Sequence, residues 1–155
     1  MLLIRRYRGQ DVGAVARLIG ENFQKFIRRD STKEGAKGFM DALADLADLR
    51  RRFSRSPIFF VATLDREIVG MVRGTPLVLT NLFVKPALHR QGIGRALLHR
   101  FEQECIRRGT DVIRLHASLY AVPFYERCGY RKTTGVRTRM GLRTQPMKRR
   151  LRTRG

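Results

Sequence analysis

Two glycines one residue apart, Gly92 and Gly94, lie where an apolar strand pattern gives way to a helical one. Backbone N–H groups in the first turn of a helix have no intrahelical partner, and the helix dipole attracts negative charge to them. Glycine lets these N–H groups approach an anion closely because no Cβ lies in the way. Three basic residues surround the pair, namely His89, Arg90 and Arg95. The stretch from Asn81 to Leu98 therefore predicts a cradle for a phosphate group.

The glycine pair alone does not specify which phosphate is bound. A Walker loop is excluded because no Gly-Lys-Ser/Thr follows the pair. A dinucleotide fingerprint fits poorly, because Leu97 occupies the place of its third glycine. A second stretch, from Ala117 to Tyr130, contains a short helical segment that carries Tyr125 and ends at Gly129, a residue suited to closing a helix. The meaning of the loop depends on this second stretch.

The two stretches together resemble the cofactor motifs of the GNAT superfamily of acetyl-CoA-dependent N-acetyltransferases. The family's loop has the form Gln/Arg-x-x-Gly-x-Gly/Ala. Its later motif is a strand ending near Asn, followed by a helix that carries Ala and, four residues on, Tyr. Both motifs occur here in the expected order with a helix between them. The loop fits in two registers, one with His89 in the first position and one running from Gln91 to Ala96, and either register places the same loop on the phosphates.

The resemblance implies a CoA site built from three parts of the chain. The N–H groups of Gln91 to Arg95 would hold the pyrophosphate. The strand around Phe83 would pair with the amides of the pantetheine arm, which would insert between two splayed parallel strands. Ser118 stands where the family usually has Asn. The implied cofactor-binding residues are Leu82, Phe83, Val84, His89, Arg90, Gln91, Gly92, Ile93, Gly94, Arg95, Ala96, Ser118, Ala121 and Phe124.

The resemblance also implies catalytic roles. Tyr125 would be the general acid that protonates the departing CoA thiolate, and a strand N–H near Phe83 or Val84 would stabilise the oxyanion. An amine attacks a thioester only when neutral, so a base is needed as well. His116, on the strand after the glycine helix, has suitable chemistry, and a hydrogen-bonded structural role competes with this one. The alternatives for the base are Glu21, Glu67 and a chain of water molecules.

Covalent catalysis and metal chemistry are not expected. Cys105 falls on the apolar face of the helix and should be a core residue, while Cys128 lacks a Cys-His-acid pattern. The two cysteines fit no disulfide framework, and the three histidines have no metal-site spacing. We therefore expect acetyl-CoA to donate directly to a primary amine in a ternary complex, with no metal.

Alternating strands and helices are predicted to position these residues. Strands are predicted at Leu2–Tyr7, Ile58–Leu64, Glu67–Arg73, Leu77–Val84, Val112–His116, Tyr130–Thr138 and Leu142–Leu151. Helices are predicted at Asp11–Arg28, Ser31–Phe53, Ile93–Gly109 and Tyr120–Arg127, the second opened by a capping box at Ser31–Glu34. Because a helix joins the strands before and after the glycine loop, these two strands should be parallel.

These elements predict an α/β (α+β) fold with one domain over residues 1–155. The resemblance makes it a GNAT-like domain, with a mixed, mostly antiparallel sheet, a central parallel strand pair splayed around the cofactor, and helices on both faces. A hydrophobic content of 43% supports a substantial core. Residues 148–155 form a basic tail that is expected to fray.

The formal charge of +20 predicts attraction to anions, and no acidic residue follows Glu126. This charge favours an anionic partner, and an acceptor with anionic groups over a polyamine, whether that acceptor is a small-molecule or a peptide amine. The alternative is a basic RNA- or ribosome-binding protein on the same fold with little or no catalysis. Against it, no aromatic residues are interleaved with the basic ones to form a stacking platform.

The sequence gives no sign of membrane insertion or export. No apolar run approaches the roughly 18 residues of a membrane-spanning helix. The N-terminus has its apolar residues before its charges, the reverse of a signal peptide. We expect a cytoplasmic location with no membrane partner, and a homodimer stays open.

Overall fold

One sheet of eight strands organises the protein. A computed structural model describes residues 1–151 of the chain. The strand order is β1-β2-β3-β4-β5-β8-β6, and β7 also pairs with β8. The strands are β1 (Leu2–Arg6), β2 (Ile58–Leu64), β3 (Glu67–Gly74), β4 (Val78–Val84), β5 (Val112–Ser118), β6 (Arg131–Lys132), β7 (Arg137–Arg139) and β8 (Leu142–Arg150). Only β4 and β5 pair in parallel, so the predicted mixed, mostly antiparallel sheet is confirmed.

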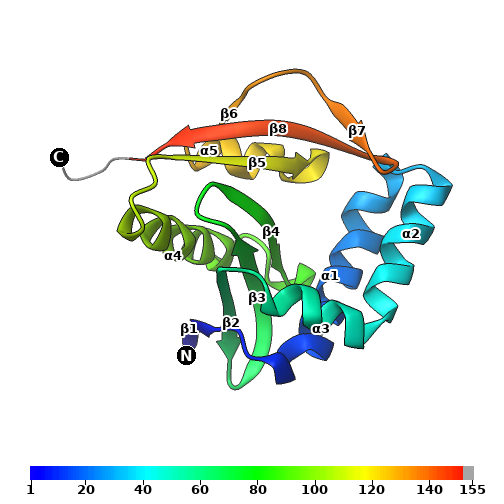
Figure 1. Cartoon of the computed structure of the whole chain (residues 1–155), viewed down its shortest axis with the longest axis horizontal. Coiled ribbons are helices and arrows are strands. Elements are labelled where there is room, and N and C mark those ends of the chain that lie inside the picture. The colour runs from blue at the N-terminus through cyan, green and yellow to red at the C-terminus, as the bar shows by residue number, and fades with distance from the viewer. Residues whose placement is uncertain (152–155) are drawn as a thin grey trace.

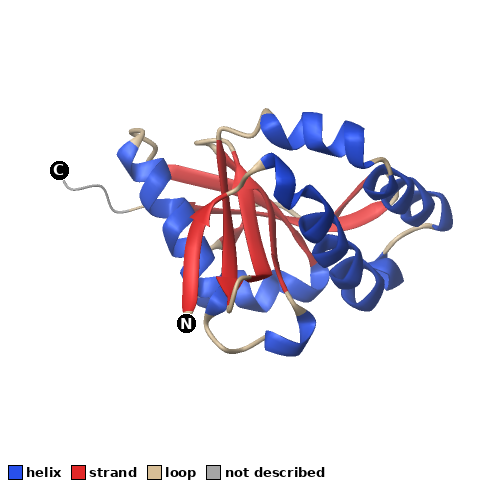
Figure 2. Ribbon diagram, turned by 90° about the horizontal axis from the view of Figure 1, so that it is seen from below, coloured by secondary structure: helices blue, strands red, loops and turns tan. Residues whose placement is uncertain are grey.

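Helices cover both faces of this sheet (Figure 2). They are α1 (Val12–Asn22), α2 (Lys33–Ala44), α3 (Leu46–Ser54), α4 (Ile93–Arg107) and α5 (Val122–Arg127). Leu97 and Phe101 of α4 pack with Phe60 in a core on one face. Val15 of α1 and Leu49 of α3 pack against the other face. In Figure 1, β5 and β8 cross above the steeply inclined β2, β3 and β4, so the two halves of the sheet are strongly rotated against each other.

The hairpin between β2 and β3 turns at Asp65 and Arg66, the two residues that separate the predicted strands. Both residues have positive φ angles, 50° and 73°, which is the backbone of a two-residue hairpin turn. The turn between β3 and β4 has a different constraint. A Cβ on Gly74 would lie 2.2 Å from the carbonyl oxygen of Val78, so only glycine fits there. These two tight turns place β4 at the centre of the sheet.

The parallel pair of β4 and β5 is short. Only Val78 and Leu79 pair with β5, opposite Arg114 and Leu115, although β4 continues to Val84. The register between β3 and β4 shifts before Gly74, which leaves Thr80 as an extra residue in β4. A bulge bends its strand, and this one lies where the parallel pairing stops. The predicted splayed pair is therefore present.

The structure corrects the prediction of one long helix from Ser31 to Phe53. The backbone leaves the helical region at Asp45, with φ −87° and ψ 84°, and two helices result. The Asp45 carboxylate accepts a hydrogen bond from the N–H of Asp48 at 3.1 Å and so caps α3. The cap of α2 is Thr32 in place of the predicted box, because its hydroxyl accepts from the N–H of Gly35.

Replacing Asp45 by Ala is expected to destabilise the protein by about 1 kcal/mol, because α3 loses its N-terminal cap. Urea denaturation measures this free energy of unfolding. The matched control is Asp41→Ala, which removes only the exposed pair with Lys37 and should cost less than about 0.5 kcal/mol. Equal losses in the two variants would contradict the capping role.

The C-terminal segment also differs from the prediction. The expected strand from Tyr130 to Thr138 is broken into β6 and β7, both paired with β8. Fraying was expected from Lys148, but β8 continues through Arg150 because it pairs with β5 along its length. Leu151 is buried, and its N–H bonds the carbonyl of Asp111. Residues 152–155 lie outside the described residues. Over residues 1–151, no helix is both long and apolar enough to cross a membrane.

Candidate active site

A cavity of about 820 Å³ opens where β4 and β5 separate. Its walls come from these strands, the loop before α4, the segment that leads into α5, and the end of α1. The predicted residues that line it are Leu82, Phe83, Val84, His89, Arg90, Gly92, Gly94, Arg95, Ser118, Ala121, Phe124 and Tyr125. The predicted residues outside its lining are Gln91, Ile93, Ala96 and His116. Most of the predicted positions thus meet in one space.

The backbone of β4 offers hydrogen-bonding groups to this space. The N–H of Lys85 bonds the carbonyl of Val69 at 2.7 Å, which fixes the phase of the antiparallel ladder with β3. Bonded and non-bonded pairs alternate in such a ladder, so Phe83 faces β3 while the N–H groups of Leu82 and Val84 point toward β5. An extended ligand with amide groups can pair with them. Phe83, by contrast, offers its side chain to the cavity but not its N–H.

The loop before α4 forms the other end of the site. Gly92 precedes the helix with a φ of 84°, the left-handed conformation that favours glycine. The first intrahelical bond of α4 runs from the N–H of Ala96 to the carbonyl of Gly92. The N–H groups of Ile93, Gly94 and Arg95 therefore have no partner within the helix. Such a group of donors fits a phosphate.

Positive charge accompanies these donors. The arginines that line the cavity are Arg90, Arg95 and Arg127. All three are exposed, so they stand at the mouth of the cavity and leave its apolar interior uncharged. A Cβ on Gly94 would approach the ring of Phe124 to 3.4 Å, so glycine keeps the space between the loop and α5 open. The residues present thus fit the phosphates and the elongated arm of CoA.

The end of α1 contributes residues that sequence reasoning missed. The helix widens after Asn22, where the N–H of Arg28 bonds the carbonyl of Phe23 five residues back. The buried Asn22 amide donates to the carbonyls of Leu18 and Val84, each at 3.0 Å. Wide helical turns of this kind often occur at functional sites, but an asparagine inside an amphipathic pattern gives no sequence signal for a contact 62 residues away.

His89 lines the cavity and is held there by contacts that the sequence did not predict. Its Nε2 lies 2.7 Å from the carbonyl oxygen of Val84. Because a carbonyl only accepts, this nitrogen carries the proton in that contact. The ring of Phe26 stacks on His89 at 5.1 Å and on Tyr120 at 4.0 Å. His89 thus holds the end of β4 beside Asn22, and the three rings form an aromatic wall across the cavity.

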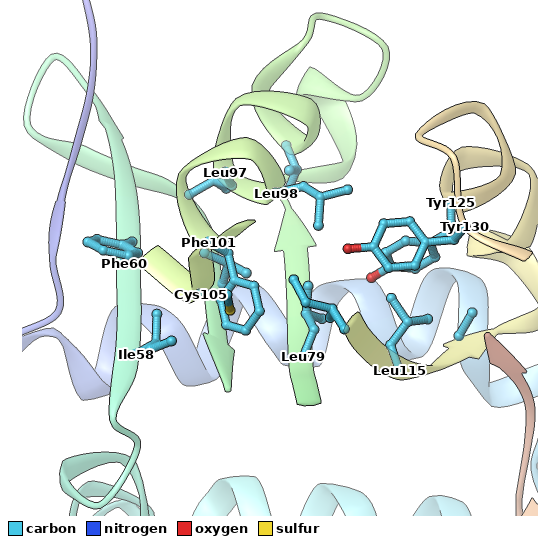
Figure 3. Packing of buried hydrophobic residues seen from close by; sticks show 14 of the residues in the cluster. Ile58, Phe60, Leu79, Leu97, Leu98, Phe101, Cys105, Leu115, Tyr125 and Tyr130 are labelled. Atoms are coloured by element: carbon cyan, nitrogen blue, oxygen red, sulfur yellow. The ribbon is translucent and has the colours of Figure 1, made fainter. Parts of the chain in front are cut away.

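Tyr125 lies deep in the cavity lining and is 5% exposed. Burial raises the pKa of its hydroxyl, with a smaller effect from Cys128, so the group stays protonated at neutral pH. Its ring packs edge-on against Tyr130 at 5.6 Å. Figure 3 shows both hydroxyl oxygens directed toward Leu98 and Leu79. Within residues 1–151, no hydrogen bond occupies the Tyr125 hydroxyl, whereas that of Tyr130 donates to Glu102 at 2.8 Å.

His116, the predicted base, lies on the exposed face of β5 outside the cavity lining. Arg139 donates to its Nε2 at 3.1 Å. Burial, and then the charge of Arg139, lower the pKa of His116. The imidazole is therefore neutral at neutral pH, but its lone pair is engaged. Of the two alternative carboxylates, Glu67 pairs with Lys85 at 2.8 Å, and both it and Glu21 lie outside the lining.

The two thiols are unsuited to nucleophilic catalysis. Cys105 is fully buried in the core, as predicted, and burial raises its pKa to about 12. Burial also raises the pKa of the half-buried Cys128. A protonated thiol is a poor nucleophile. No cluster of metal-ligating side chains large enough to hold an ion occurs among the described residues.

The chain belongs to the GNAT acetyltransferase family, because residues 27–151 match that family's acetyltransferase (GNAT) domain. No curated protein matches the sequence closely enough to count as a relative.

Solved structures of GNAT proteins share the fold over nearly the whole chain. A GCN5-related N-acetyltransferase from Rhodopseudomonas palustris superposes with a TM-score of 0.86 at 23% identity, covering 96% of this chain and 95% of its own. The PaiA N-acetyltransferase from Thermoplasma acidophilum, solved in complex with coenzyme A, gives 0.81 at 18% identity, covering 97% and 99%. The ribosomal-protein-S18-alanine N-acetyltransferase from Escherichia coli gives 0.67 at 19% identity, covering 100% and 97%.

Proposed function

We propose that this protein is an N-acetyltransferase that transfers acetyl from acetyl-CoA to a primary amine by direct attack in a ternary complex. The observation that carries the proposal is one cavity that is lined both by the glycine loop of α4 and by Tyr125. The names of the solved relatives support an amine acceptor, since one of them acetylates an alanine of a ribosomal protein. When bound, acetyl-CoA supplies the thioester that the amine attacks.

In this proposal each part of the cavity has a separate task. The free N–H groups at the start of α4 hold the pyrophosphate. The N–H groups of Leu82 and Val84 are the donors toward β5, so of the three predicted strand residues these two are the candidates for pairing with the arm, and Val84 is the candidate of the predicted pair for stabilising an oxyanion. The carbonyl of Val84 already accepts from Asn22 and His89, which leaves the carbonyl of Leu82 as an acceptor.

Proton transfer is assigned to Tyr125 and to solvent. The raised pKa of Tyr125 suits a donor to a leaving thiolate. His116 stays the predicted base, but it can accept a proton only after Arg139 moves away from Nε2. A positive environment offers another route, because nearby like charges lower the pKa of an ammonium group. An amine entering among arginines then loses its proton to water more readily.

Calorimetric titration with acetyl-CoA, followed by mass-spectrometric detection of acetylated products over a panel of amines, tests the proposal. We expect saturable coenzyme binding and transfer to at least one amine class. Titration with nonspecific RNA at two salt concentrations is the counter-measurement, because electrostatic RNA binding weakens steeply with salt. Absence of coenzyme binding alongside salt-resistant RNA binding would contradict the proposal.

A further inference from the structure

Arg73 is a half-buried arginine without an acidic partner. It extends from β3 across the ring of Phe53, with its guanidinium carbon 4.8 Å from the ring centre. Its Nε donates to Asn81 Oδ1 at 2.7 Å, and its Nη1 donates to Ser56 Oγ at 3.0 Å. Both partners are neutral. Within the described chain, no hydrogen bond occupies Nη2, so one end of the guanidinium is free to bind a ligand.

The other arginines that make part-buried hydrogen bonds show how unusual this arrangement is. Arg5 pairs with Asp11, Arg149 pairs with Glu102, and two arginines at the end of α4 pair with Glu104. Among residues 1–151, Arg73 is the arginine with part-buried hydrogen bonds that meets no carboxylate. Burying a charge without a counter-ion is unfavourable, so its persistence suggests an anion that the chain itself does not supply.

The position of Arg73 places that anion beside the proposed reaction. Arg73 pairs across the sheet with Asn81, which precedes Leu82 in the cavity wall. Met71 and Phe83 are the next cross-strand pair on the same face, and Phe83 also lines the cavity. Two residues along a strand span about 7 Å. Arg73 itself lies outside the cavity lining, two positions along the sheet from the pair that contains Phe83, which is a separation comparable to the length of a small amine.

The surroundings of Arg73 strengthen its attraction for an anion. Burial, and then the charge of Arg52, lower the pKa of Arg73 to about 10, so the group is still cationic at neutral pH. Arg114 and His116 share this face of the sheet on β5, and Arg139 donates to His116. Strands β4 to β8 contain no Asp or Glu. The strands of this face therefore supply no counter-ion, and the carboxylate of Asp48 on the neighbouring helix α3 is engaged with Arg51 and Arg52.

We propose that Arg73, held by Asn81 and Ser56, is a specificity-determining residue that binds a carboxylate on the acceptor amine. This inference rests on the proposed N-acetyltransferase function and narrows its substrate class to amines that carry a carboxylate. A carboxylate is planar and singly charged, and it matches one free guanidinium end through two parallel hydrogen bonds. A phosphate group carries more charge and calls for more donors than Arg73 has left. Polyamines are disfavoured because this face repels them.

A series of ω-amino carboxylates tests the proposal. Acetylation of glycine, β-alanine, γ-aminobutyrate and ε-aminocaproate is compared with that of their amides, which keep the amine and lose the charge. For the best chain length, we expect the wild type to favour the acid over its amide by about 10- to 100-fold in kcat/KM, as for a hydrogen bond to a charged group. Comparing a peptide that has Glu at its N-terminus with one that has Gln there tests whether a side-chain carboxylate is recognised as well as the carboxylate of an amino acid.

Two variants separate recognition from structure. Arg73→Met keeps the apolar contact with Phe53, and it should raise KM for the acids at least tenfold, bring the acid-to-amide preference near 1 and leave the amides unchanged. Arg73→Lys should restore part of the preference. The matched control Arg5→Met removes a paired arginine on β1, far from the cavity, and should lower stability without changing the preference. The urea midpoint of Arg73→Met checks that this variant stays folded, because it loses the hydrogen bonds to Asn81 and Ser56 together with a half-buried charge.

Several results would overturn the inference. The first is an equal kcat/KM of the wild type for the acids and their amides. The second is an equal fall in kcat/KM for acids and amides in Arg73→Met. The third is a higher kcat/KM for O-phosphoethanolamine than for every carboxylate. If acetyl-CoA binds but no amine is acetylated, the proposed function fails while the inference stays testable. Titration of N-acetyl-β-alanine into the wild type and into Arg73→Met, both in the presence of CoA, then tests the inference. Binding to the wild type alone would support it. Equal binding to both proteins, or binding to neither, would contradict it.

Discussion

Replacing Tyr125 by Phe is expected to lower the turnover of acetyl transfer by about 100- to 1,000-fold, the range for loss of a general acid. The affinity for CoA should stay within about twofold, because the phenyl ring keeps its packing against Phe124 and Tyr130. The reason lies in the hydroxyl, which is free of protein partners within residues 1–151 and directed toward β4. Burial raises its pKa, so below about pH 10 its own deprotonation should not reduce the rate.

Single-turnover kinetics with acetyl-CoA and a saturating amine separate this effect from product release. Tyr130→Phe is the matched control, since it removes a neighbouring hydroxyl that is engaged with Glu102. That variant should lose stability by about 1 kcal/mol or more and keep most of its turnover. Similar rates for wild type and Tyr125→Phe would remove Tyr125 as the acid.

Local signals in the sequence were enough to predict the centre of the site. The loop around Gly92 and the helix carrying Tyr125 are each continuous in the chain, and their chemistry depends on backbone conformation and residue type. The parallel pairing of β4 and β5 followed from the helix between them. These features are fixed by short-range interactions or by topology, and the structure brings them together around one cavity.

The parts that could not be predicted depend on contacts between distant segments. Asn22 reaches Val84 only because α1 widens and packs across the sheet. Asp45 ends one helix and begins another, although the apolar pattern continues through it. The last strand is ordered through Arg150 because β5 pairs with it, despite its basic composition. For Asn22 and the last strand, tertiary packing outweighed the local pattern, whereas at Asp45 a local capping bond did so.

The backbone groups of β4 that point toward β5 could also be identified only from the structure. A strand pattern shows that alternate residues face opposite ways, but it does not say which carbonyls and N–H groups bond to which neighbour. The bond from Lys85 to Val69 sets that phase, which turns the N–H of Phe83 toward β3 and leaves Val84 as the one of the two expected oxyanion donors whose N–H points toward β5. The unpartnered state of Arg73 is likewise invisible in the sequence, since thirteen acidic residues were available to pair with it.

Replacing Gly94 by Leu is expected to weaken CoA binding on the order of 100-fold or more, which corresponds to about 2.7 kcal/mol. A Cβ at this position would already touch the ring of Phe124 at 3.4 Å and Val84 Cγ2 at 3.6 Å, and both residues line the cavity. The additional atoms of leucine must therefore occupy the space between the loop and α5. Gly94 lies in the first turn of α4, where leucine is favoured over glycine, so the fold should tolerate the change.

Isothermal titration with CoA measures this loss, and urea denaturation checks that stability is retained. Gly94→Ala is the matched control, because its single methyl group makes contacts at the edge of ordinary van der Waals distance and should change affinity by less than about threefold. If the leucine variant binds CoA as tightly as the wild type, the ligand does not pass between the loop of α4 and Phe124. The glycine pair would then serve only the turn into the helix, and the proposed route from pyrophosphate to Tyr125 would be wrong.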